Sequence, residues 1–169
     1  LLINAESKSE IITIEKIAKD YKIKVNIGIR LNPNTDAKTI KQISTGKKEN
    51  KFGVSEKIFL NLTNYVINSK YLNLKCLSVH IGSQILDYRP YVKMIQVIDR
   101  VISKSQHKFE YVDLGGGMGI NYDLKSKELN YGKYNRKINQ LLSNHNVKII
   151  FEPGRSIIGN TAVLVTKVI

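Results

Sequence analysis

The 169-residue sequence predicts an α/β fold that is part of a (β/α)8 barrel. Apolar, strand-like runs alternate with amphipathic, helix-like segments, and this alternation favours a parallel sheet. Polar or glycine-rich groups follow four of the apolar runs directly, as expected at the active-site end of such a barrel. About five strands can be counted, whereas a closed barrel needs eight. We therefore expect an interior piece of a larger barrel domain.

The first third of the chain predicts two strands and one helix. Residues 1–4 form a short apolar run, and residues 9–21 carry isoleucines at 11, 14 and 17, which gives one apolar helical face. Residues 24–31 are rich in β-branched side chains and predict a strand, which the turn Asn32-Pro33-Asn34 ends. Residues 35–50 are polar and lysine-rich, and we expect them to pass over the barrel mouth.

The remainder predicts the same alternation. A helix begins at Ser55, because Ser55-Glu56 supplies a cap and an acid for the first turn. Apolar periodicity then predicts helices to residue 68, over 90–104 and over 127–143, and strands over 74–80, 111–114 and 147–151. The last nine residues, 161–169, are strongly β-prone and predict another strand.

Composition excludes several classes of function. The net charge is +13, but lysines are spread along the chain and no nucleic-acid-binding motif is present, so we expect a solvated basic surface and no nucleic-acid partner. No apolar run reaches 18 residues and no secretory signal precedes residue 15, which together favour a cytoplasmic protein without a membrane partner. The single cysteine, Cys76, excludes an internal disulfide and is expected in the core.

The segment Glu152-Pro153-Gly154-Arg155 is the strongest candidate site, because it follows the apolar run at residues 147–151. A carboxylate, a rigid turn, a small residue and a guanidinium can together bind a base and an anion. A plain salt bridge between Glu152 and Arg155 is the structural alternative.

Two further clusters follow strands. Gly115-Gly116-Gly117-Met118-Gly119 allows close approach of a phosphate to free backbone N–H groups, although a purely structural turn is equally compatible. It matches neither a dinucleotide fingerprint nor a Walker loop. His80-Ile81-Gly82-Ser83-Gln84 places an imidazole and a hydroxyl together, and a buried core histidine is the alternative. No motif of a serine hydrolase or a metal site is present.

Five motifs, in this order, resemble diaminopimelate decarboxylases, which are fold-type III pyridoxal-phosphate enzymes related to ornithine and arginine decarboxylases and to alanine racemase. The motifs are Arg30-Leu31-Asn32-Pro33, the segment from Ser44-Thr45-Gly46 to Lys51-Phe52-Gly53, His80-Ile81-Gly82-Ser83-Gln84, Asp113 through Gly119, and Glu152-Pro153-Gly154-Arg155. The resemblance implies a barrel of the alanine racemase-like type with pyridoxal 5'-phosphate as cofactor. It also implies a homodimer that decarboxylates meso-2,6-diaminoheptanedioate to L-lysine.

The resemblance also assigns roles to individual residues. His80 and Glu152 are the implied catalytic residues: His80 stacks on the cofactor ring and Glu152 binds the ring nitrogen. Arg155 holds the phosphate and a substrate carboxylate, and Lys51 reaches the partner subunit. The remaining implied cofactor-binding residues are Arg30, Ser83, Gly115, Gly116, Gly117, Pro153 and Gly154.

The family pattern is only partly present. No motif of the type Tyr-Ala-x-Lys-Ala, which carries the family's Schiff-base lysine, occurs in the sequence. We expect residues 1–160 to form the central and C-terminal part of the barrel, and residues 161–169 to start a strand leading to an absent C-terminal β-domain. Such a fragment is expected to be inactive alone. The alternatives are an arginine- or ornithine-type decarboxylase and a non-catalytic remnant.

Overall fold

A computed structural model describes residues 1–36, 52–122, 128–163 and 165–167. Within these residues, five strands form one parallel sheet in the order β1-β2-β3-β4-β5. The strands are β1 (Leu2–Ala5), β2 (Val25–Arg30), β3 (Leu72–Ser78), β4 (Tyr111–Asp113) and β5 (Lys148–Ile150). Each strand pairs with the next strand in the chain, which is the arrangement of consecutive strands in an α/β barrel. The predicted fold class is therefore confirmed.

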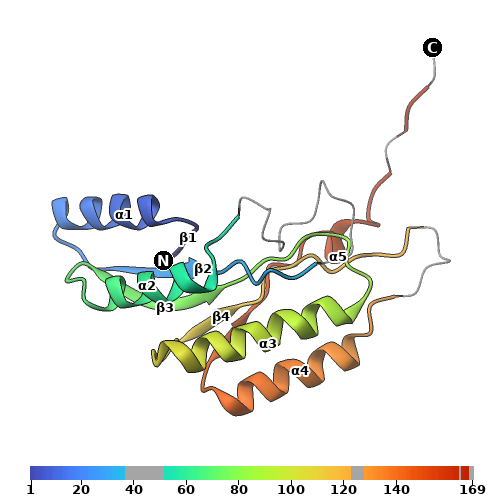
Figure 1. Cartoon of the computed structure of the whole chain (residues 1–169). Helices are drawn as coiled ribbons and strands as arrows, with labels where there is room; N and C mark the ends of the chain where they lie inside the picture. Colours follow the sequence, from blue (N-terminus) through green and yellow to red (C-terminus); the bar gives the residue numbers. More distant parts are fainter. Residues whose placement is uncertain (37–51, 123–127, 164, 168–169) are drawn as a thin grey trace.

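Four long helices connect the strands, and Figure 1 shows α3 and α4 lying side by side. The helices are α1 (Lys8–Asp20), α2 (Glu56–Ile67), α3 (Tyr88–Ser105) and α4 (Tyr131–Asn144), followed by the short α5 (Arg155–Ile158). Sequence periodicity located the four long helices and missed α5, because four residues are too few to show a helical period. None of the helices in the described ranges is long and apolar enough to cross a bilayer.

The two faces of the sheet differ in chemistry. Ile27 and Ile29 of β2 point to the face that packs against the helices, and both are fully buried in the hydrophobic core. Gly28 lies on the opposite face, where an added Cβ would come within 2.0 Å of Asn4 Oδ1 and 2.9 Å of Cys76 Cβ. Because side chains alternate along a strand, Arg30, Ser78 and Asp113 share this second face. We call it the polar face.

The strand predicted over residues 161–169 is not formed by the described residues of that segment. The described residues of the segment lie away from the sheet in Figure 1, and Val163 and Val165 are 88% and 86% exposed. A β-prone sequence needs a neighbouring strand to complete its backbone hydrogen bonds, and no strand in the described ranges pairs with it.

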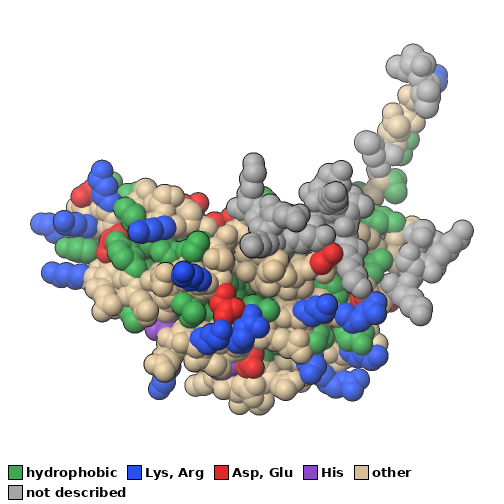
Figure 2. Space-filling model, viewed as in Figure 1, with side chains coloured by type: hydrophobic (Ala, Val, Ile, Leu, Met, Phe, Trp, Pro, Cys, Tyr) green, Lys and Arg blue, Asp and Glu red, His purple; other side chains and the backbone are tan. Residues whose placement is uncertain are grey.

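Basic side chains are spread over the described part of one face of the molecule. On the face shown in Figure 2, Lys and Arg side chains lie in several separate groups rather than along one continuous track.

Candidate active site

One polar side chain follows or ends each of the five strands at the same edge of the sheet. Because the strands are parallel, their carboxyl ends meet at this edge. The five side chains are Glu6, Arg30, His80, Asp113 and Glu152. Three of them, Arg30, His80 and Glu152, were predicted as site residues, Asp113 was predicted only as part of a motif, and Glu6 was not predicted. A signal for Glu6 was available, since one residue separates it from the apolar run at residues 1–4.

Arg30 is held by three groups at this edge. Its Nη1 forms an ion pair with Glu6 Oε1, and its Nη2 lies 3.5 Å from the carbonyl oxygen of His80. The guanidinium carbon also lies 5.2 Å from the centre of the Phe52 ring, within cation–π range. These contacts fix the charge of Arg30 beside His80.

The His80 ring is oriented by the glycine turn. Gly116 N donates a hydrogen bond of 3.2 Å to His80 Nδ1. A nitrogen that accepts a hydrogen bond carries no proton, so the neutral ring has its hydrogen on Nε2. Burial, and then the nearby Arg30 charge, lower the pKa of His80. The imidazole is therefore a neutral, flat surface at neutral pH.

Only glycine fits this turn. Gly115 has φ +64°, and an added Cβ would lie 2.6 Å from the carbonyl oxygen of Val79 and 2.7 Å from His80 Nδ1. An added Cβ on Gly116 would lie 2.0 Å from the carbonyl oxygen of Glu152. The glycines therefore let three loops pack directly against one another.

Contrary to the expectation from the sequence, the N–H groups of Gly115 and Gly116 are not free to bind a phosphate, because both already donate hydrogen bonds within the protein. Gly115 N donates to Asp113 Oδ1 at 2.9 Å, and Gly116 N donates to His80. Both bonds are internal to the protein, and no sequence pattern reveals them because they depend on how two loops meet. The turn thus contributes close backbone approach and a fixed histidine.

Glu152 lies over the glycine turn. Its backbone N–H donates to the carbonyl oxygen of Gly115 at 2.9 Å, which ties the end of β5 to the end of β4. Partial loss of solvation raises the pKa of the Glu152 carboxyl, the Asp113 charge raises it further, and Arg30 acts in the opposite direction. The side chain itself is exposed. An exposed carboxylate with raised proton affinity suits contact with a protonated nitrogen of a ligand.

Arg155 pairs with Gln84 rather than forming the simple salt bridge with Glu152 considered above. Its Nη1 donates to Gln84 Oε1 at 3.3 Å. Gln84 also holds the loop after the glycine turn, because its Nε2 donates to Ile120 O at 2.6 Å and its Oε1 accepts from Ile120 N at 3.3 Å. Gln84 therefore orients the guanidinium, a role that sequence analysis did not assign to it.

The other predicted site residues occupy the same region or lie outside the described residues. Ser83 is half-buried between His80 and Gln84. Pro153 and Gly154 form the turn before α5, and an added Cβ on Gly154 would meet no atom within 4 Å. This space is open to a ligand. Lys51 lies outside the described residues.

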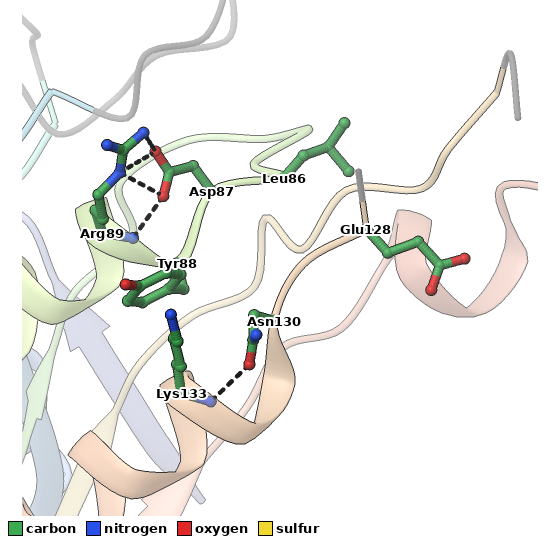
Figure 3. A pocket seen from close by; sticks show the side chains of 7 residues that line it. All are labelled: Leu86, Asp87, Tyr88, Arg89, Glu128, Asn130 and Lys133. Atoms are coloured by element: carbon green, nitrogen blue, oxygen red, sulfur yellow. Dashed lines mark hydrogen bonds and ion pairs between the residues drawn. The ribbon is translucent and has the colours of Figure 1, made fainter. Parts of the chain in front are cut away.

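A pocket of about 610 Å³ lies elsewhere, where α3 and α4 begin (Figure 3). Two of its polar residues, Asp87 and Asn130, are the N-caps of α3 and α4. Asp87 accepts from Arg89 N and forms an ion pair with the Arg89 side chain, while Asn130 accepts from Lys133 N. Figure 3 shows Lys133 pointing at the Tyr88 ring, with Nζ 5.0 Å from the ring centre. These contacts are those of helix caps, and we assign no ligand to the pocket.

Residues 2–159 match the family model described as the pyridoxal binding domain of pyridoxal-dependent decarboxylases. The chain belongs to this family. Among curated proteins, it is 40% identical to diaminopimelate decarboxylase of Helicobacter pylori over all of the chain and 42% of that protein. It is 39% identical to the Aquifex aeolicus diaminopimelate decarboxylase, over 99% of the chain and 41% of the relative.

The structure agrees with these matches. The crystal structure of the Helicobacter pylori enzyme complexed with L-lysine superposes with a TM-score of 0.88 at 40% identity, covering 93% of this chain and 40% of that one. Diaminopimelate decarboxylase from M. jannaschii superposes with a TM-score of 0.79 at 32% identity, covering 92% of this chain and 38% of that one. The five-stranded parallel sheet is therefore part of an alanine racemase-like barrel, and the chain spans about two fifths of these relatives.

The residues at the strand ends fit the family's cofactor, pyridoxal phosphate. That molecule has a flat ring, a basic ring nitrogen and a phosphate. The structure offers a neutral imidazole at His80, an exposed carboxylate at Glu152 and a half-buried guanidinium at Arg155. The open space over Gly154 lies in the same turn. These three groups match the ring, the ring nitrogen and the phosphate of such a molecule in shape and charge.

Proposed function

We propose that this chain is the cofactor-binding part of a diaminopimelate decarboxylase, which converts meso-2,6-diaminoheptanedioate to L-lysine and carbon dioxide. The observation that carries the proposal is the convergence of His80, Glu152 and Arg155 at one sheet edge. The chain that brings them together is 40% identical over its whole length to the Helicobacter pylori enzyme.

Bound pyridoxal phosphate would supply an electron sink for the electrons left behind when carbon dioxide departs. Glu152 would hold the proton of the ring nitrogen through a charge-assisted hydrogen bond, which makes that sink deeper. His80 would cover one face of the ring, because Gly116 N keeps the imidazole in place. Arg155 would bind the phosphate and a substrate carboxylate, and Gln84 would hold its guanidinium in position.

The other residues would shape the same site. Arg30 and Ser83 would line it, and Pro153 and Gly154 would set the turn that carries Arg155. Gly115, Gly116 and Gly117 would let the phosphate approach the backbone closely. Of these, Gly115 and Gly116 would act mainly through packing, because their N–H groups already have partners.

We further propose the domain organisation and assembly. Residues 1–160 would form the central and C-terminal part of the barrel, and residues 161–169 would lead into a C-terminal β-domain that supplies the missing strand partner. The complete protein would be a cytoplasmic homodimer in which Lys51 contacts the partner subunit. Because the sequence contains no Tyr-Ala-x-Lys-Ala motif, we expect no decarboxylation by residues 1–169 alone.

A chimeric enzyme tests the activity. Residues 1–169 replace the matching 42% of the Helicobacter pylori enzyme, and carbon dioxide release is measured with meso-2,6-diaminoheptanedioate, arginine and ornithine. We expect release from the first substrate alone, and strong loss in the Glu152→Gln chimera. Release from arginine or ornithine instead would place the chain with those decarboxylases. A folded chimera that binds the cofactor but releases nothing would identify a non-catalytic remnant.

A further inference from the structure

Asp113 is the one acidic side chain that is buried in the described parts of the chain, with 1% of its surface exposed. A buried carboxylate costs free energy unless hydrogen bonds compensate for the lost water. The roles proposed above leave Asp113 without a function. Its contacts indicate what it does.

Three donors converge on the Asp113 carboxylate from three elements. Gly115 N donates to Oδ1 at 2.9 Å, while Asn4 Nδ2 and Ser78 Oγ lie 3.1 and 3.2 Å from Oδ2. These donors come from the glycine turn, from β1 and from β3. All three contacts suit an anionic carboxylate, which only accepts hydrogen bonds.

The first contact fixes the glycine turn. The bond from Gly115 N to the side chain two residues earlier is an Asx turn, which sets the backbone direction at that point. The following N–H, that of Gly116, then points at His80 Nδ1. Asp113 therefore acts on the imidazole through the turn.

The second effect is electrostatic. Asp113 pairs in register with Ile150, two residues before Glu152. The two side chains meet past the end of β5, because a hydrogen bond between the Glu152 and Asp113 carboxyl groups is among the causes that raise the pKa of Glu152. The Asp113 charge is one of the causes that raise the pKa of Glu152, after partial loss of solvation. The opposing charge is Arg30, which is itself paired with Glu6.

We propose that Asp113 is a positioning residue, which fixes the glycine turn against His80 and places a second negative charge beneath Glu152. The inference rests on the proposed role of Glu152. Two negative charges favour a protonated ring nitrogen more strongly than one. The resulting function of Asp113 is to strengthen the interaction between Glu152 and the cofactor without touching it.

Carboxyl titration by carbon-13 NMR tests the electrostatic part in the chain without cofactor. Asp113→Asn removes the charge and keeps an oxygen for Gly115 N. We expect the titration midpoint of Glu152 to move to lower pH. The control is Glu110→Gln, which removes a half-buried carboxylate paired with Lys75 at the other end of β4, and it should leave the titration midpoint of Glu152 unchanged. An unchanged midpoint in Asp113→Asn would overturn the proposal.

Two further variants complete the test. Asp113→Ser is also neutral and can form the equivalent turn with its hydroxyl, so it replaces Asp113→Asn if that variant does not fold. Asp113→Ala removes the turn as well, and nitrogen-15 NMR should then show His80 losing its preference for the Nε2–H form. Retention of that preference would refute the turn's role. Both measurements are independent of activity, so their failure leaves the chimera result unaffected.

Discussion

Arg155 and Gln84 are joined by a hydrogen bond of 3.3 Å from Nη1 to Oε1, although they lie 71 positions apart in the sequence. Gln84 has φ +59°, a left-handed conformation that is uncommon outside glycine, asparagine and aspartate. The same amide binds both backbone groups of Ile120. The side chain of one residue, whose backbone conformation is unfavourable, thus joins the loops after β3, β4 and β5.

Replacing Gln84 with alanine should weaken cofactor binding, because Arg155 loses the partner that orients it. We expect the dissociation constant of pyridoxal phosphate in the chimeric enzyme to rise about fivefold, which corresponds to about 1 kcal/mol. Fluorescence titration measures it. Gln106→Ala is the matched control, since Gln106 is also left-handed but ends α3 away from the site. Equal weakening in both variants would contradict the assigned role.

Replacing Gly116 with alanine should destabilise the fold, because the new Cβ would meet the Glu152 carbonyl oxygen at 2.0 Å. We expect the free energy of unfolding to fall by about 2 kcal/mol or more. Urea denaturation of the chain measures this. Gly154→Ala is the control, as its Cβ meets nothing within 4 Å and should leave stability nearly unchanged. Equal free energies of unfolding for the two variants would show that the close packing of Gly116 against Glu152 is wrong.

The protonation of His80 predicts a pH dependence of stability. Its pKa is lowered in the folded chain, so the unfolded chain binds more protons and stability falls with decreasing pH. The loss begins near the ordinary histidine pKa of about 6.5 and is complete below the folded pKa. Urea denaturation at several pH values should show a steeper decline for the unmodified chain than for His80→Asn. Parallel curves would argue against a neutral, half-buried imidazole.

Cys76 should be unreactive while the chain is folded. Burial raises the pKa of its thiol to about 12, and the neighbouring Asp113 charge acts in the same direction. Since the thiolate is the nucleophile, labelling by iodoacetamide at pH 8 should be slow in buffer and fast in concentrated urea. Rapid labelling of the folded chain would show that the polar face is more open than described.

The positions of His80, the glycine turn and Glu152 could be predicted from sequence, because each directly follows an apolar strand and parallel strands end at one edge. The ion pair between Glu6 and Arg30 could not be predicted, because it depends on which strands are neighbours and on the register between β1 and β2. The three donors around Asp113 depend on the same register.

Two other predictions depended on neighbouring segments of the fold, which the sequence does not identify. The strand expected over residues 161–169 needs a partner strand, and propensity alone does not supply one. The N–H groups of Gly115 and Gly116 were expected to be free, but Asp113 and His80 accept from them. A run of glycines predicts that another group can come close to the backbone. It does not predict whether that group belongs to a ligand or to another loop of the protein.

The site is also connected to the outer layer of helices. The buried Tyr91 of α3 donates from its hydroxyl to the carbonyl oxygen of Gly116 at 3.1 Å. Its ring stacks on Tyr134 of α4, with ring centres 4.5 Å apart. The helical pair is therefore in direct contact with Gly116, the residue that orients His80. Engineering that alters cofactor affinity can accordingly begin at two tyrosines outside the ligand's reach.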